Sequence, residues 1–133
     1  MSKHYQASLR VRFSELDLYG HVHHAELFKY FEWARMEYLK LAGLSFTGLM
    51  ESGIYIVIVS AQISFSSPAF YDEELAISGT VSHIGRTSFT MTQKIEEKTS
   101  RRTIAEGEFT FVCLNQARQK ISVPRDVLGA FFE

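Results

Sequence analysis

The stretch Phe13–Arg35 reads FSELDLYGHVHHAELFKYFEWAR, and it decides the architecture that we expect for the whole chain. It crosses a short loop that contains Asp17 and Gly20, and then enters a helix through a run of histidines. From Ala25 onward the charged residues recur at helical spacing on one narrow stripe, opposite a broad apolar sector. That sector comprises Leu27, Phe28, Phe31, Ala34, Tyr38 and Ala42. Because a surface helix needs only one apolar stripe, we expect the remaining elements to wrap this helix.

The remaining sequence predicts strands that can do so. We expect strands over residues 5–13, 54–65, 74–84, 87–97 and 103–115, the main helix over 23–42, further helical turns over 45–51 and a closing helix near 124–132. The nearly continuous apolarity of 54–65 predicts a central strand, buried on one face by the helix and on the other by a second subunit. Successive strands joined by short turns pair antiparallel. The predicted fold is therefore α+β, a curved antiparallel five-stranded sheet around one long helix.

Length and composition limit the function classes. With 133 residues, the chain is expected to form one domain over 1–133. Its 14 basic and 15 acidic residues leave no excess positive charge to attract nucleic acid. The single cysteine, Cys113, cannot form an intramolecular disulfide, and no apolar run is long enough to span a bilayer. We therefore expect a cytoplasmic protein.

The chain resembles the hotdog-fold acyl-CoA thioesterases, the group that includes 4-hydroxybenzoyl-CoA thioesterase. The residues that carry the resemblance are Asp17, Gly20, His21–His24, Tyr30, Glu32, Ala34, Arg35 and the turn Pro68–Asp72. The resemblance implies a hotdog fold, hydrolysis of an acyl thioester of coenzyme A or of acyl carrier protein, and no metal or organic cofactor. It also implies a homodimer or a dimer-of-dimers tetramer, with the active site at the subunit interface.

Asp17 is the candidate catalytic carboxylate. It precedes a helix start, where unpaired amides and a partial positive charge favour a developing oxyanion. A carboxylate beside a polarised thioester carbonyl attacks it directly or deprotonates a water that does. The resemblance assigns the catalytic role to Asp17 and the polarising role to the amides near His23 and His24. The alternative is that Asp17 only forms a loop turn or caps the helix.

Other candidate site residues follow from their positions. His24 is expected to point inward with Phe28 and Phe31, as an acid, a base or a positioner of water, or as a hydrogen-bonded core residue. Gly20 and His23 belong to the loop expected to contact substrate. The substrate's size stays open, because His23 and Leu27 depart from the residues frequent in relatives.

More distant candidates are Ser60, Arg86 and Ser88. Ser60 either faces the acyl group or bonds to a neighbouring backbone. Arg86 and Ser88 match the turn where relatives bind coenzyme A phosphates, a task that suits arginine, or Arg86 is simply a solvated turn residue.

Several alternatives stay open. Three histidines within residues 21–24 seldom converge tetrahedrally, so we expect no metal. Arg35 falls in the apolar sector and is expected to need a carboxylate partner, namely Glu15, Asp17 or Glu32. The enzymatic alternative is a hotdog hydratase or dehydratase acting on acyl thioesters, and the non-enzymatic alternative is an acyl-CoA binding module.

Overall fold

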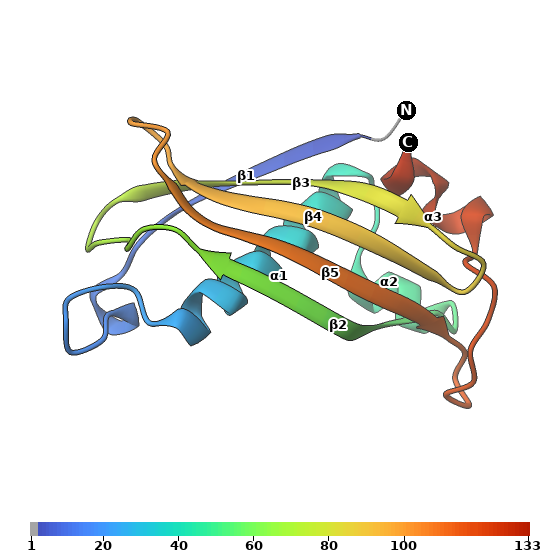
Figure 1. Cartoon of the computed structure of the whole chain (residues 1–133). Helices are drawn as coiled ribbons and strands as arrows, with labels where there is room; N and C mark the ends of the chain where they lie inside the picture. Colours follow the sequence, from blue (N-terminus) through green and yellow to red (C-terminus); the bar gives the residue numbers. More distant parts are fainter. Residues whose placement is uncertain (1–2) are drawn as a thin grey trace.

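The computed structural model describes residues 3–133, which form one antiparallel sheet with a long helix across one of its faces (Figure 1). In chain order the elements are β1 (His4–Arg10), the 3-10 helix η1 (Phe13–Glu15), α1 (His24–Leu41), α2 (Phe46–Glu51), β2 (Tyr55–Phe65), β3 (Glu74–Ile84), β4 (Ser88–Glu97), β5 (Thr103–Leu114) and α3 (Arg125–Phe132). The sheet order is β1-β3-β4-β5-β2, and all neighbouring strands are antiparallel. The predicted five-stranded sheet around one long helix is confirmed.

The long helix α1 begins and ends where the sequence predicts. Its first turn is capped by His23, whose Nδ1 accepts a hydrogen bond of 3.0 Å from the amide of Ala25. Beyond its last residue, Gly43 has a φ of +80°, a conformation in which glycine closes a helix end without steric cost. Among residues 3–133, no helix is long and apolar enough to cross a membrane.

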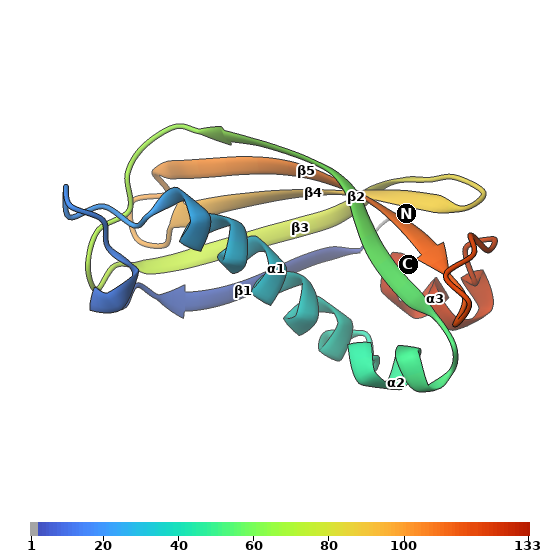
Figure 2. The same cartoon turned by 90° about the horizontal axis from the view of Figure 1, so that it is seen from below.

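The core lies between α1 and the sheet. The second view shows α1 running across one face of the strands (Figure 2). Two glycines of the sheet leave room for aromatic rings of the core. A Cβ atom added to Gly79 of β3 would lie 2.7 Å from Cε2 of Tyr38, and one added to Gly107 of β5 would lie 2.5 Å from Cε2 of Phe109. Both distances are too short for real contacts, so aromatic rings of the core occupy the space that these glycines leave.

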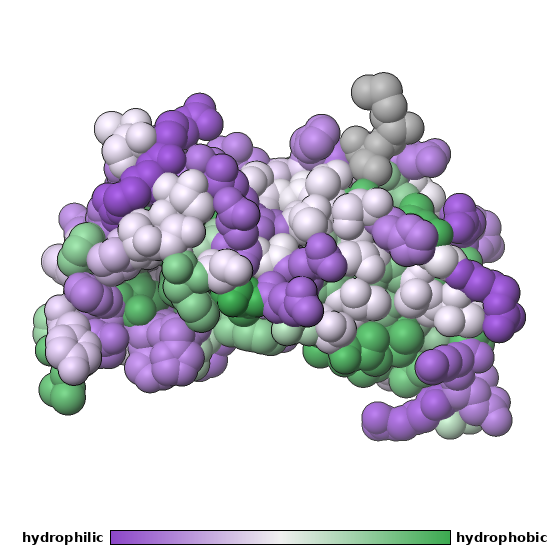
Figure 3. Space-filling model, in the orientation of Figure 1, coloured by the Kyte–Doolittle hydropathy of each residue, from purple (hydrophilic) through white to green (hydrophobic). Residues whose placement is uncertain are grey.

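The prediction of a central strand over residues 54–65 is wrong. β2 is an edge strand that pairs only with β5 within the chain, and most of its residues are exposed. Its apolar side chains Val57, Ile58 and Val59 are exposed, and hydrophobic surface is visible along this edge (Figure 3). A strand whose apolar face is left open by its own chain has the same sequence pattern as one buried inside it.

Two smaller expectations also differ from the structure. The first strand stops at Arg10 rather than continuing to residue 13, because the 3-10 helix η1 begins at Phe13. Phe28 of the predicted apolar sector is 36% exposed, because the side of α1 that carries it is only partly covered within the chain.

Candidate active site

The loop that contains Asp17 is closed like a small hairpin. Leu16 and Val22 form an isolated antiparallel bridge, and the amide of Asp17 donates to the carbonyl oxygen of His21 at 2.7 Å. Gly20 supports the reversal with a φ of +78°, in the left-handed region that disfavours other residues. The loop therefore has a defined shape set by its own backbone.

The second matched stretch, 68–72, packs against this loop. The amide of Val22 donates to the carbonyl oxygen of Ala69 at 2.9 Å, and His21 and Phe70 form a further isolated bridge. The rings of His21 and Phe70 also meet edge to face at 5.3 Å between centroids. The two stretches that carry the resemblance are thus neighbours in space as well as in pattern.

The carboxylate of Asp17 is half-buried and held on one side only. Its Oδ1 accepts hydrogen bonds from the amides of Tyr19 at 2.9 Å and His21 at 3.2 Å. Within the described residues, its Oδ2 accepts no hydrogen bond. Asp17 therefore makes the loop turn named above as the alternative role, and it keeps one carboxylate oxygen for chemistry.

The helix start offers fewer free amides than expected. The amide of His23 donates to the carbonyl oxygen of Glu15 at 2.9 Å, so the predicted role of the His23 amide as an oxyanion donor is wrong. The amide of Ala25 is taken by the His23 ring. In the described part of the chain, the amide of His24 has no hydrogen-bond acceptor. It is the amide at this helix end that remains for a ligand.

The side chain of His24 is exposed, which corrects the expectation that it points inward. The ring stacks on the ring of His23, with 4.2 Å between centroids. Helical spacing placed it on the side shared with Phe28, but that side is itself open at the first turn of α1. The imidazole therefore lies at the surface of the helix start.

A buried contact that the sequence reasoning missed ties the loop to the helix. Glu15 is 5% exposed, and its Oε1 accepts a hydrogen bond of 2.7 Å from the hydroxyl group of Tyr30. Burial by itself would raise the pKa of Glu15, but the hydrogen bonds from Tyr30 and Arg12 outweigh it and lower that pKa. The sequence did contain a signal for this contact. Glu15 is an acidic residue two positions before Asp17, and Tyr30 is one of the residues on the predicted helix that carry the family resemblance.

Arg35 does not pair with Glu15, Asp17 or Glu32, so the expected carboxylate partner is wrong. It is 8% exposed, and its Nη1 donates to Oε1 of Gln93 at 2.9 Å. The guanidinium also lies over the rings of Phe109 and Phe111, at 4.6 and 5.1 Å from their centroids. Burial lowers the pKa of Arg35 to about 10. A neutral amide and two aromatic faces take the place of the carboxylate.

Three predicted substrate residues lie away from the loop within this chain. Ser60 is opposite Thr110 in the β2–β5 ladder, so it shares the outer face of the sheet rather than the face toward α1. Arg86 and Ser88 lie at the β3–β4 turn, at the opposite end of the molecule from the Asp17 loop (Figures 1 and 2). One chain does not bring these residues together with Asp17.

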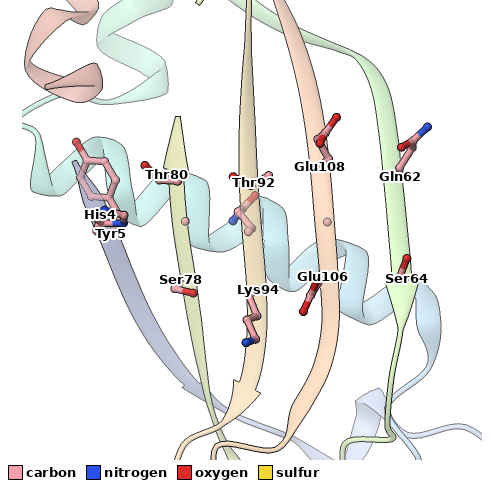
Figure 4. Close-up of a pocket in the computed structure, with 13 residues that line it drawn as sticks. His4, Tyr5, Gln62, Ser64, Ser78, Thr80, Thr92, Lys94, Glu106 and Glu108 are labelled. Carbon is pink, nitrogen blue, oxygen red and sulfur yellow. The ribbon is translucent and has the colours of Figure 1, made fainter. Parts of the chain in front are cut away.

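A broad hollow of about 460 Å³ lies on the outer face of the sheet. Its labelled side chains are small or polar, including Ser78, Thr92 and Glu106, and α1 lies behind the strands (Figure 4). Asp17 and His24 do not line it. The hollow is therefore separate from the candidate active site.

Metal and thiol chemistry lack support in the described residues. Over 3–133, no three His, Cys, Asp or Glu side chains are grouped to hold a metal ion. Cys113 is buried, and burial raises the pKa of its thiol to about 11, which disfavours the reactive thiolate.

Comparisons with known proteins identify relatives of this chain. The sequence profile of the thioesterase-like superfamily matches residues 11–131. The chain is 29% identical to a putative esterase of Aquifex aeolicus over 119 residues, 90% of this chain and 91% of that protein. It is also 29% identical to the long-chain acyl-CoA thioesterase FadM of Escherichia coli, over 86% of each chain. A 1,4-dihydroxy-2-naphthoyl-CoA thioesterase from Synechocystis shares its fold with a TM-score of 0.90 at 21% identity, over 97% of this chain and 96% of that one.

Proposed function

The chain belongs to the thioesterase-like superfamily and is a hotdog-fold acyl-CoA thioesterase, and from this premise we propose that Asp17 and the amide of His24 carry out the hydrolysis. Asp17 acts as the general base or as the nucleophile, and the amide of His24 polarises the thioester carbonyl. The observation that carries the proposal is the unpaired amide of His24, at the end of the loop that leaves Oδ2 of Asp17 free.

With Asp17 as the base, the reaction proceeds as follows. Oδ2 removes a proton from water as the water oxygen adds to the thioester carbon, and the carbonyl oxygen becomes an oxyanion that accepts a hydrogen bond from the amide of His24. The carbon–sulfur bond then breaks, and the leaving thiolate takes up the proton. The products are a carboxylic acid and the free thiol of coenzyme A.

The ring of His24 keeps an auxiliary role in this proposal. It is exposed beside the free amide, where an imidazole ring exchanges a proton with water or with the leaving group. Gly20 acts through its backbone by permitting the turn, and His23 acts through its side chain by capping α1.

We propose further that the active enzyme is an oligomer assembled through β2. An exposed edge strand of 11 residues with apolar side chains is an energetic liability unless another chain covers it. Arg86 and Ser88 lie too far from Asp17 in one chain, so a role in binding coenzyme A requires them to come from a second copy. A tetramer, acyl carrier protein as an alternative thiol carrier, and a cytoplasmic location remain predictions.

The decisive experiment compares two Asp→Asn variants on a panel of acyl-CoA thioesters, with release of free thiol as the readout. Asp17→Asn is expected to lower kcat by about 100-fold or more, because the base or nucleophile is lost. Asp72→Asn is the matched control: Asp72 lies in the neighbouring turn, its side chain is 63% exposed, and its contact with Arg10 is loose, at 3.7 Å.

Wild-type kcat is expected in the control. Full activity of Asp17→Asn would contradict the mechanism. Absence of thiol release by the wild type on every thioester, with binding retained, would instead indicate a binding module.

A further inference from the structure

Glu15 is a buried carboxylate to which the proposed mechanism gives no role. It lies two residues before Asp17, at the end of η1, and is 5% exposed. Burying an ionised carboxylate is costly unless hydrogen bonds satisfy it. The arrangement of those hydrogen bonds indicates what the residue does.

Four donor atoms converge on the Glu15 carboxylate. Oε1 accepts from the hydroxyl group of Tyr30 at 2.7 Å and from the amide of Arg12 at 2.8 Å. Oε2 accepts from Nη2 and Nε of Arg12, at 2.9 and 3.3 Å. The Arg12 side chain is 79% exposed, so water and salt screen its attraction. Tyr30 is buried in α1, so its hydroxyl group is the well-defined anchor between the loop and the helix.

The backbone of the same residue makes a second connection. The carbonyl oxygen of Glu15 accepts a hydrogen bond of 2.9 Å from the amide of His23, the capping residue of α1. Glu15 therefore touches α1 twice, through its side chain in the body of the helix and through its backbone at the helix start. Asp17 follows Glu15 by two residues, and the free amide of His24 follows His23 directly.

From this geometry we infer that Glu15 and Tyr30 are positioning residues that set the separation between the Asp17 carboxylate and the amide of His24. The inference rests on the proposed function. Neither residue touches the reacting atoms. Together they fix the loop against α1, and a misplacement of about 1 Å between reacting groups lowers catalysis by up to about 100-fold.

Tyr30→Phe tests this inference, because it removes a single buried hydroxyl group and keeps the ring. Tyr38→Phe is the matched control. Tyr38 lies two turns further along α1, is fully buried, and donates its hydroxyl hydrogen to the carbonyl oxygen of Ile77 at 2.6 Å, far from the loop. Both variants lose one buried hydrogen bond, and the melting temperature should fall further in Tyr30→Phe, because its acceptor is a carboxylate rather than a neutral carbonyl group.

The two variants should differ in kinetics. Tyr30→Phe is expected to lower kcat by about 10-fold or more while KM changes by less than about threefold, and Tyr38→Phe is expected to keep kcat within about twofold of the wild type. Wild-type kcat in Tyr30→Phe, or the same loss in both variants, would overturn the inference. If Tyr30→Phe does not fold, Glu15→Gln is measured against the same control and is held to the same criterion.

A readout independent of activity separates this inference from the proposed function. The amide resonances of Tyr19 and His21, which donate to Asp17, and the exchange protection of the His23 amide should change in Tyr30→Phe but not in Tyr38→Phe. Unchanged amides in Tyr30→Phe would overturn the positioning role even if Asp17 is catalytic. Conversely, Asp17→Asn could keep its activity while the amide resonances change in Tyr30→Phe. That result would contradict the mechanism and leave the role of Glu15 and Tyr30 in anchoring the loop intact.

Discussion

Gly20 and Gly129 differ in backbone conformation although both have free space around them. A Cβ added to either one would meet no atom within 4 Å. Gly20 has a φ of +78°, whereas Gly129 lies in α3 with ordinary helical geometry. An added methyl group should therefore change stability differently at the two positions only because their backbone conformations differ.

We predict opposite effects of Gly20→Ala and Gly129→Ala on stability. Gly20→Ala should lower the free energy of unfolding by about 1–2 kcal/mol, because alanine disfavours the left-handed region. Gly129→Ala should raise it by about 0.5–1 kcal/mol, because alanine favours the helix. Urea unfolding measures both values, and a loss of equal size in both variants would contradict the backbone argument.

The pH dependence of stability should report on Glu15. Its pKa in the folded chain lies below the ordinary value of 4.5, so its stabilising contribution is complete above pH 4.5 and is lost as the pH falls through the lower folded-state pKa. In melting experiments from pH 7 to pH 3, Glu15→Gln should be less stable than the wild type at pH 7. The difference should shrink at acidic pH, and a constant difference over the whole range would contradict the lowered pKa.

The sequence predicted the position of the Asp17 loop better than the surroundings of individual side chains. The resemblance, rather than spacing alone, assigned Asp17 its catalytic role, which stays a prediction, and both Asp17 and Gly20 lie in the predicted loop. The orientation of His24 and the partner of Arg35 were wrong, because neighbours distant in the chain decide them. Gln93, which accepts the hydrogen bond from Arg35, lies 58 residues away in sequence.

At the scale of elements, the close contact between α1 and β3 depends on Gly79. An added methyl group would lie 2.7 Å from the ring of Tyr38, which is fully buried and cannot move into solvent. Gly79→Ala should therefore lower the free energy of unfolding by about 1–3 kcal/mol through overpacking. Ser78→Ala, on the outer face of the same strand, should change it by less than about 0.5 kcal/mol. Equal effects in urea unfolding would mean that the helix accommodates the methyl group by shifting.

Element boundaries were predictable where a local signal marks them. The capping residue His23 and the left-handed Gly43 delimit α1 at the expected positions. The end of β1 was not predictable from alternation, because residues 11–13 continue the alternating pattern although the 3-10 helix η1 begins at Phe13.

At the scale of the whole molecule, β2 is an edge of the sheet that its own chain leaves uncovered. Its edge carries exposed Val57, Ile58 and Val59, which an antiparallel partner strand would cover. We expect the wild type to sediment as an oligomer of the 15.2 kDa chain. Val59→Asp should shift it toward the monomer, because a carboxylate on the apolar edge cannot be covered without losing its hydration.

The control for this prediction is Ser8→Asp, on β1 at the other edge of the sheet. It should leave the oligomer and its kcat unchanged. Val59→Asp should lower the rate of thioester hydrolysis together with the mass, if a second copy supplies part of the coenzyme A site. A fully active monomer would contradict the shared site, and a wild-type monomer would contradict assembly through β2.

The sequence by itself determined the long helix, the alternating strands and the Asp17 loop, because helical periodicity, strand alternation and glycine conformations are set by neighbours within a few residues. Only the tertiary structure decided that β2 is an edge, that the amide of His24 is free while that of His23 is not, and that Glu15 meets Tyr30. These features depend on which distant segments come into contact, and an apolar pattern is the same whether its own chain or another covers it.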